Sequence, residues 1–455
     1  MTLIFRPVLL LVVLGAAGCS TVWPEYERPQ VEAPAALVRP LTIDRQWWTA
    51  FDDPVLTALV EESLLNNWDL AKASANVAEA KAAAATARAQ LSPRVDGGVK
   101  AGATQRQLTL GAASLDDITS TGSIGMSIQW EIDLWDRIAQ MNDAALARFA
   151  ASEHARNATT LSISTLVAET WFQLCVLDAK LLITRDAANN LKSASNLEFR
   201  RWKAEAGTEL AYIQSLAEYS STEARLPAIE GAISQTELAL QLLVGRSPRA
   251  MNGRLARGAL LKVPETPREI DSALLLRRPD VASAELLLVA AHADIHSARA
   301  EFYPRLTLSL LAGFVASTSK LISGMPLFWD ASGSLTAPIF DAGLVQSKVD
   351  GAEARRLQAL AHYQYTVSLA YRDADQALVL LDTSDRQVKS TEDEIVVRKR
   401  SVVLAEKSYE AGRTSKFEVL SETIKVLNSQ LLLADAKYTQ LSARSQYYKA
   451  LGGGF

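Results

Sequence analysis

SIGMSIQW, residues 123–130, alternates small or polar residues with apolar ones. Because successive side chains of a β-strand point to opposite faces, this period of two predicts a strand with one apolar and one polar face. The apolar face holds Ile124, Met126, Ile128 and Trp130. The polar face holds Ser123, Ser127 and Gln129.

Two β-hairpins are predicted around this pattern. The first pairs residues 123–130 with about Val95–Thr104 and places a loop at Gly111–Asp117. The second pairs Leu306–Phe314 with roughly Trp329–Ile339. Strands of about ten residues are long enough to cross a bilayer when tilted. A half-buried hairpin of a soluble protein would alternate in the same way, so the pattern alone leaves both structures open.

Four strands cannot close a transmembrane barrel, because such a barrel needs at least about eight. Either the strands do not span a membrane, or several copies of the chain pool them. Beyond residues 1–18 the chain has no run of about 18 apolar residues, so we expect no transmembrane helix. A membrane crossing would then require a closed β-barrel.

Long helices are predicted on either side of the hairpins. From Pro54 apolar residues recur at helical spacing, which predicts one helix that ends near Ser92-Pro93. Gly343 to about Glu410 is free of proline and predicts a helix on the order of 100 Å long. In the last helix the apolar residues alternate spacings of four and three, the heptad period of a packed helix seam. They are Leu420, Ile424, Leu427, Leu431, Ala434, Tyr438 and Leu441.

The chain contains two internal repeats, offset by about 200 residues. Leu91-Ser92-Pro93-Arg94 before the first hairpin matches Phe302-Tyr303-Pro304-Arg305 before the second. Asp133 and Asp341 follow the hairpins and are predicted to be N-caps. Later in each repeat a glycine, Gly207 or Gly412, separates two helical runs. A unit with so little core must pack against neighbouring copies.

Composition excludes some classes of function. The 47 basic and 51 acidic residues give a net charge of −4, which offers no basic surface for nucleic acid. Aromatic residues make up only 7% of the chain, which favours long, closely packed helices over large globular cores. We find no phosphate loop, nucleophile elbow or acid–base pair, so we expect no enzyme activity and no cofactor.

The N-terminus predicts export from the cytoplasm. Residues 1–18 have the positive start, short apolar run and small residues of a secretory signal peptide. Cys19 follows small residues, as in the lipobox of bacterial lipoproteins, so we expect its thiol to carry a covalent lipid. The alternative is an ordinary signal peptide with a cysteine near the cleavage site. Cys175, the other cysteine, lies in an apolar helical stretch.

His292 and His296 share one face of a helix at the spacing of metal ligands. No glutamate follows the first histidine and the sequence shows no third ligand. From the sequence we therefore expect no metal site.

Several motifs together resemble the TolC-like outer-membrane efflux factors, specifically the NodT-type lipoproteins of resistance-nodulation-division pumps. The most specific motif is Arg277-Arg278-Pro279-Asp280, followed by Ala298-Arg299-Ala300-Glu301-Phe302-Tyr303-Pro304-Arg305. Trp47-Trp48 and Trp130-Glu131-Ile132-Asp133-Leu134-Trp135 match as well. Pro279 suits the first turn of a helix, and a structural role is the more plausible one for the motif.

The resemblance implies a mainly α fold with β structure. In it, a homotrimer pools four strands per protomer in one twelve-stranded outer-membrane β-barrel, which a periplasmic α-helical barrel continues. Ser123, Ser127 and Gln129 would then face the lumen. The expected divisions are a signal peptide, 1–18; a lipidated extended segment, 19–50; helices of repeat 1, 51–91; hairpin 1, 92–132; α-barrel helices of repeat 1, 133–250; a connecting and equatorial segment, 251–301; hairpin 2, 302–341; and α-barrel helices of repeat 2, 342–455.

The resemblance also implies a function. It is that of the outer-membrane channel of a tripartite efflux system, a passive duct for drugs, toxic compounds or metal ions. The implied partners are a periplasmic adaptor and an inner-membrane resistance-nodulation-division transporter, and the implied location is the outer membrane, with the chain extending into the periplasm. A duct for type I protein secretion and a structural coiled-coil lipoprotein remain alternatives.

In this family inward-turned helices with rings of polar and acidic residues close the periplasmic end. The matching positions here are Arg413, Thr414, Glu418 and Ser421, with Glu209 after the other glycine turn. Ser421 stands where a second acidic residue is common, which weakens the case for a double acidic ring. An ordinary solvated helix end is the alternative for these positions.

Overall fold

The computed structural model describes residues 26–29, 44–110, 113–247, 261–267, 275–317 and 326–454, with backbone alone for 106–110 and 113–119. It divides into two compact units. Unit 1 comprises residues 1–30, 77–152 and 284–363, and unit 2 comprises 31–76, 153–283 and 364–455. Cys19 and most of the predicted extended segment lie outside the described residues.

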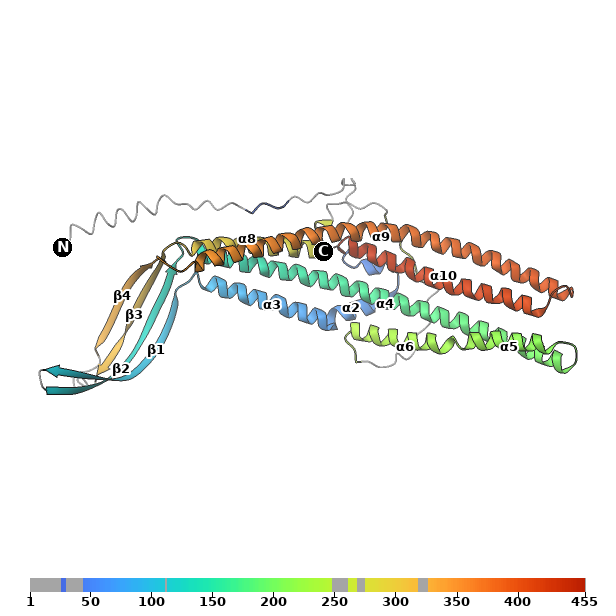
Figure 1. The fold of residues 1–455 in the computed structure, drawn as a ribbon, viewed down its shortest axis with the longest axis horizontal. Coiled ribbons are helices and arrows are strands. Elements are labelled where there is room, and N and C mark those ends of the chain that lie inside the picture. The colour runs from blue at the N-terminus through green and yellow to red at the C-terminus, as the bar shows by residue number, and fades with distance from the viewer. Residues whose placement is uncertain are drawn as a thin grey trace. The chain divides into compact units, whose positions relative to one another are not determined.

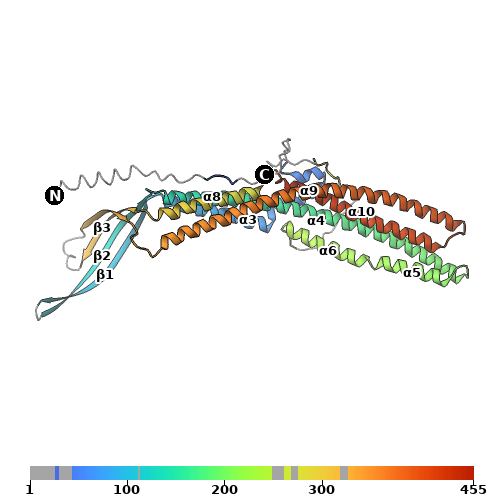
Figure 2. The same cartoon turned by 45° about the horizontal axis from the view of Figure 1, so that its top comes forward.

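Unit 1 contains one four-stranded antiparallel sheet with the order β1-β2-β3-β4. Its strands are β1 (Arg94–Leu110), β2 (Ala113–Ile132), β3 (Arg305–Ser317) and β4 (Leu327–Thr336). The two hairpins come from distant parts of the sequence and meet between β2 and β3, as Figures 1 and 2 both show. Both predicted hairpins are therefore present, and they form one sheet.

The predicted loop at Gly111–Asp117 is wrong, because β2 begins at Ala113 and pairs with β1 as far as Leu110. The backbone ladder continues past the alternating stretch, since its hydrogen bonds do not depend on side-chain type. The last strand ends at Thr336, three residues before the predicted Ile339. Pro338 follows two residues later and has no N–H to donate to the ladder.

The helices of unit 1 approach one another through alanine. These are α8 (Pro279–Ala300) from Ala284 onward, and parts of α3 (Trp68–Ala89), α4 (Arg137–Lys203) and α9 (Leu344–Glu410). Buried Ala144 on α4 packs with Ala290 and Ala293 on α8. Such small side chains let helix backbones come close together. The closely packed helices predicted from the low aromatic content are therefore present here.

Each hairpin leads into its long helix through a left-handed turn. Asp136 has φ +56° before α4, while Ala342 and Gly343 have φ +53° and +83° before α9. The predicted N-cap positions are wrong, because the helices begin at Arg137 and Leu344. The aspartates still cap from further upstream: Asp133 Oδ2 accepts from Ala139 N at 2.7 Å, and Asp341 Oδ2 accepts from Val345 N at 2.9 Å. The hydrogen bonds from the backbone of Val345 and Gly343 lower the pKa of Asp341.

Unit 2 is a helical bundle around one aromatic core. It contains η1 (Trp47–Phe51), α2 (Pro54–Asn66), α5 (Glu209–Glu223), α6 (Leu226–Leu243), α10 (Lys416–Ala450) and the remaining parts of the long helices. Buried Trp47, Trp48 and Phe51 join Trp171 and Phe172 in this core. Asp53 caps α2 and accepts a hydrogen bond from Trp171 Nε1 at 2.9 Å.

The single helix predicted from Pro54 is two helices, α2 and α3, broken at Asn67 (φ −68°, ψ 132°). Asn67 Oδ1 accepts from the backbone N–H groups of Asp69 and Leu70, which caps α3. Its Nδ2 donates to the Leu243 carbonyl at 2.8 Å. A partner distant in sequence therefore fixes the break, which the helical pattern of apolar residues does not reveal.

The predicted heptad face of α10 is the face that packs inward. Leu420, Leu427, Ala434 and Leu441 are buried, and the positions between them are half-buried. In both ribbon views α10 lies beside the second part of α9, and α5 lies beside the end of α4 (Figures 1 and 2). Within the described residues, no helix has the length and apolar character needed to cross a membrane.

Candidate functional site

The sheet has one exposed apolar face. Val99 is 76% exposed, Met126 58% and Trp329 72%. Cross-strand pairing places the other apolar alternates on the same face, because Ile124 pairs with Phe314 and Trp130 with Leu308. A contiguous apolar surface of this kind marks a surface that is covered by another apolar phase or molecule. Each strand is at least ten residues long, enough to cross a bilayer.

On β1 and β2 the opposite face is polar, while Leu311, Val315 and Phe328 of the second hairpin also lie on it. Ser123 pairs with Lys100, and Ser127 pairs with Asp96, so the predicted polar residues share a face with charged partners. Gly125 pairs with Gly313 on this face, and a Cβ built on Gly125 would lie 2.8 Å from the Ala312 carbonyl oxygen. Only glycine tolerates such a close approach of two backbones. The apolar face and the polar face of the sheet are therefore suited to different surroundings, one apolar and one aqueous.

Indole groups fix the end of the sheet nearest the helices. Trp130 Nε1 donates to the Leu91 carbonyl at 3.1 Å, and Trp135 Nε1 donates to the Pro304 carbonyl at 2.7 Å. Trp135 also stacks on Tyr303 at 4.9 Å between ring centroids. The two hairpins are thus tied together where they enter the helices, which gives the Trp130–Trp135 motif a structural role.

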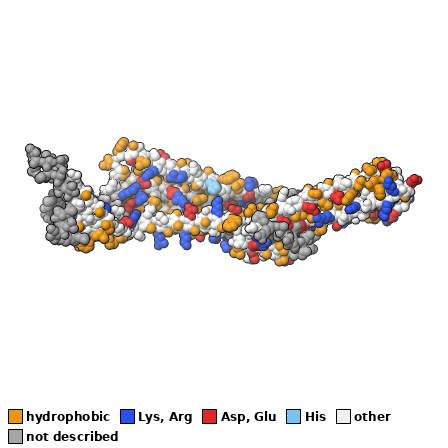
Figure 3. Space-filling view, turned by 90° about the horizontal axis from the view of Figure 1, so that it is seen from below, with side chains coloured by type: hydrophobic (Ala, Val, Ile, Leu, Met, Phe, Trp, Pro, Cys, Tyr) orange, Lys and Arg blue, Asp and Glu red, His pale blue; other side chains and the backbone are white. Residues whose placement is uncertain are grey.

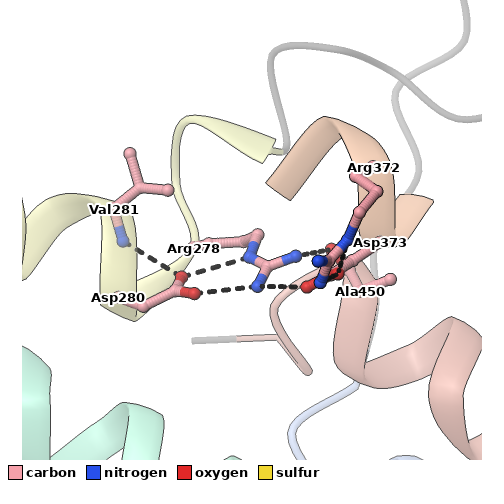
Figure 4. Close-up of polar contacts among 6 residues, drawn as sticks. All are labelled: Arg278, Asp280, Val281, Arg372, Asp373 and Ala450. Carbon is pink, nitrogen blue, oxygen red and sulfur yellow. Dashed lines mark hydrogen bonds and ion pairs between the residues drawn. The ribbon is translucent and has the colours of Figure 1, made fainter. Parts of the chain in front are cut away.

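Arg278 explains the Arg277-Arg278-Pro279-Asp280 motif. The residue is 6% exposed, and its Nη2 lies 2.8 Å from Asp280 Oδ2 and 3.3 Å from Asp373 Oδ2. Its Nη1 donates to the Ala450 carbonyl at 3.1 Å, so it caps the end of α10 (Figure 4). Burial alone would lower the pKa of Arg278, but the two carboxylates raise it above its ordinary value. Pro279 is the first residue of α8, as predicted.

Two turns at the ends of the long helices contain or directly precede the predicted gate residues. Gly412 has φ +71° after α9, and the Arg413 N–H donates to the Ser408 carbonyl at 2.8 Å, which closes the helix end. After α4 the left-handed residue is Glu205 at φ +56°, with Ala206 N–H donating to the Arg201 carbonyl at 2.8 Å. Gly207 lies in the same turn without a left-handed φ. Both glycines thus separate two helices, as predicted, but only Gly412 supplies the left-handed residue of its turn.

The gate candidates lie in the turn before α10 and in the first turns of α10 and α5. Glu418 is in the first turn of α10 and Glu209 in the first turn of α5, and both are exposed. Arg413 is exposed, while Thr414 and Ser421 are half-buried.

One contact that sequence reasoning missed joins the two turns. Arg201 Nη1, near the end of α4, donates to Tyr409 Oη, near the end of α9. The Arg201 guanidinium and Lys416 Nζ lie 5.8 Å and 5.2 Å from the centre of the Tyr409 ring, within range of cation–π attraction. Residues 208 positions apart meet here. No short-range sequence signal predicts such a pair.

Apolar side chains are exposed on the helices that flank these turns. Leu210 on α5 is 65% exposed, and Val396 and Val397 on α9 are 68% and 69% exposed. Figure 3 shows hydrophobic side chains beside basic ones over the helix ends at its right. Such surfaces are typical of helices that pack against another subunit.

Comparison with known proteins agrees with these features. A sequence model described as "Outer membrane efflux protein" matches residues 59–246 and 271–453. The pyoverdine export outer membrane protein OpmQ of Pseudomonas putida is 32% identical, over 100% of this chain and 98% of its own length. The probable outer membrane lipoprotein SilC of Salmonella typhimurium is 27% identical, over 96% of both chains. The crystal structure of the Campylobacter jejuni CmeC outer membrane channel superposes with a TM-score of 0.86 at 25% identity, covering 95% of this chain and 94% of CmeC.

Proposed function

Because the chain belongs to the outer membrane efflux protein family, we propose that three copies form a passive duct for small molecules in a tripartite efflux system. The chain is an outer-membrane efflux channel component. The observation that carries the trimeric duct is the four-stranded sheet with an exposed apolar face and two outer strands, β1 and β4.

The outer strands support the trimer. In the described sheet β1 and β4 each pair on one side only, and an unpaired strand edge favours addition of another strand. Four strands are too few for a closed barrel, whereas β4 of one copy beside β1 of the next yields twelve strands in three copies. The apolar face would then contact hydrocarbon, and the face with Lys100 and Ser127 would line the water-filled lumen.

The helix-end turns are the proposed periplasmic gate. Exposed Glu418 and Glu209 would form carboxylate rings in the trimer, which would attract cations and repel one another. The contact between Arg201 and Tyr409 holds the two turns of one protomer together and supports a closed arrangement. For the end to open, either this contact must break, or the pair α4 and α5 must move together with the pair α9 and α10.

The anchor and partners are also proposals. SilC is named as a lipoprotein, which supports acylation of Cys19 in this chain. The family resemblance supports a periplasmic adaptor and an inner-membrane resistance-nodulation-division transporter as partners. The name of OpmQ places pyoverdine among the compounds that relatives export, which supports small molecules over proteins as cargo.

Single-channel conductance of the acylated protein in planar bilayers tests the duct. We expect small, cation-preferring currents. Tyr409→Phe should raise them, because it removes the acceptor of the Arg201 hydrogen bond that holds the two turns together, whereas Glu418→Ala should reduce the cation preference, because the carboxylate ring is lost. Unchanged currents from a trimer would keep the duct and contradict the gate. A folded protein that neither inserts nor conducts would contradict the duct and favour the structural lipoprotein.

A pull-down from cells distinguishes the efflux duct from a type I secretion duct. The efflux function predicts crosslinks to an adaptor and a proton-driven exchanger in the same complex. Recovery of an ATP-driven exporter in place of the exchanger would support secretion. Loss of cell resistance to small toxic compounds on deletion would again support efflux.

A further inference from the structure

Two histidines of α8 converge in unit 1. His292 and His296 lie one helical turn apart, and their Nε2 atoms are 3.1 Å apart. The rings meet nearly edge to face, at 70° and 4.7 Å between centroids. The two Nε2 atoms are hydrogen-bonded to each other, so a metal ion bound by both would replace the proton that they share.

This spacing suits two ligands of one metal ion. Imidazole nitrogens bind zinc at about 2.0–2.1 Å, and two bonds of this length to atoms 3.1 Å apart enclose an angle of about 95–102°. That angle lies between the 90° of square-planar or octahedral sites and the 109° of tetrahedral ones.

The surroundings leave room for the other ligands of the ion. A cavity of about 400 Å³ is lined by His292, His296, Arg299, Glu353 and Arg356, among others. Among the described residues no group of three metal-binding side chains occurs, so water or an anion would complete the coordination. Arg299 donates to Glu353 Oε1 at 2.6 Å, which offsets its charge, while Arg356 would favour an anionic co-ligand.

Tyr26 packs against the pair from another segment of unit 1. Its ring lies 6.0 Å from the ring of His292 at 66°. Arg28, two residues later, pairs with Glu285 on α8. These contacts hold a short N-terminal segment against α8 and help to fix the orientation of His292.

We propose that His292 and His296 form a two-histidine site for a divalent transition-metal ion. Imidazole suits copper, nickel and zinc, and Cu²⁺ binds most tightly of the three. The site lies on α8 whatever the channel exports, so it does not rest on the proposed function. The proposal departs from the expectation from the sequence that no metal binds here.

Titration of the acylated protein with CuCl₂ tests the site, by calorimetry and by electron paramagnetic resonance. We expect one tight site per chain with hyperfine splitting from two imidazole nitrogens. His292→Gln and His296→Gln should each weaken Cu²⁺ binding about 100-fold, because a chelate loses its second ligand. His154→Gln and His362→Gln change the two remaining histidines of the four and should leave the affinity unchanged.

A wild-type spectrum with one nitrogen or none would overturn the proposal, even if a variant failed to fold. Equal Cu²⁺ affinity in wild type and in folded His296→Gln would overturn it too. Circular dichroism of each variant, measured without metal, identifies those that remain folded.

Discussion

Arg277 and Arg278 are adjacent in sequence but differ sharply in environment. Arg277 is exposed, whereas Arg278 is buried between Asp280, Asp373 and the carbonyl of Ala450. Asp280 and Asp373 are partly exposed, so loss of Arg278 removes hydrogen bonds to charged groups without leaving a buried unpaired charge, and costs about 1–3 kcal/mol. The motif thus joins α8, α9 and α10 of unit 2 through one side chain.

We expect Arg278→Gln to lower stability by about that amount, while Arg277→Gln stays within about 0.5 kcal/mol of wild type. Thermal unfolding followed by circular dichroism measures both. Equal melting temperatures for the two variants would show that the buried contacts contribute little.

The two helix-end turns offer a matched backbone test. Glu205 holds φ +56° where glycine would be less strained, and Gly412 holds φ +71° without strain. Glu205→Gly should raise stability, and Gly412→Ala should lower it, each by up to about 1 kcal/mol. Shifts of the same sign in the two melting curves would contradict this account.

The sequence pattern predicted on which face of a strand a residue lies, but it did not predict which distant residues come into contact. The alternation of Ile124, Met126 and Trp130 is visible in the sequence because it depends only on strand geometry. The contact of Arg201 with Tyr409 and the break at Asn67 depend on residues far away in the chain. No local pattern encodes such contacts.

At the scale of elements, the two-faced sheet predicts that the same substitution has different effects on membrane insertion at neighbouring positions of one strand. Met126 lies on the apolar face and Ser127 on the polar face. A lysine on a lipid-facing strand costs about 2–4 kcal/mol near the bilayer midplane, whereas a lysine in a lumen changes selectivity instead. We therefore expect Met126→Lys to block insertion into lipid vesicles and Ser127→Lys to allow it. Vesicle flotation measures insertion, and equal flotation of both variants would contradict the assignment of faces.

Glu422 links α10 to α9. Its carboxylate accepts from Lys425 Nζ at 2.6 Å and from Ser401 Oγ on α9 at 2.8 Å, and these hydrogen bonds lower its pKa from the ordinary value of 4.5. A lowered pKa means that the folded state binds protons less readily than the unfolded state. The contribution of Glu422 to the stability of the fold is therefore complete above pH 4.5 and is lost as pH falls below it.

Glu422→Gln should therefore destabilise the protein at neutral pH and flatten its loss of stability in acid. Glu406→Gln, an exposed position on α9, serves as the control. Melting curves at a series of pH values measure the effect. A Glu422→Gln curve parallel to wild type throughout would contradict a role for this carboxylate in linking the helices.

At the scale of the whole molecule, the repeats made the order of elements predictable. Helix, hairpin and long helix recur in both halves, and the family resemblance supplied the pairing of the two hairpins in one sheet. Strand ends were less predictable, because β1 and β2 extend beyond the alternating stretch by backbone pairing alone. The number of copies is not encoded in any one segment, since it follows from how edges and exposed apolar faces match between chains.

The stoichiometry of the folded protein tests the central claim most directly. Native mass spectrometry of the acylated protein, released from detergent, should give three times the mass of one processed chain. The open edges of β1 and β4 and the exposed apolar faces of α5 and α9 predict this result. A folded protein that remains a single chain, or that forms only dimers, would contradict the pooled barrel and with it the trimeric duct.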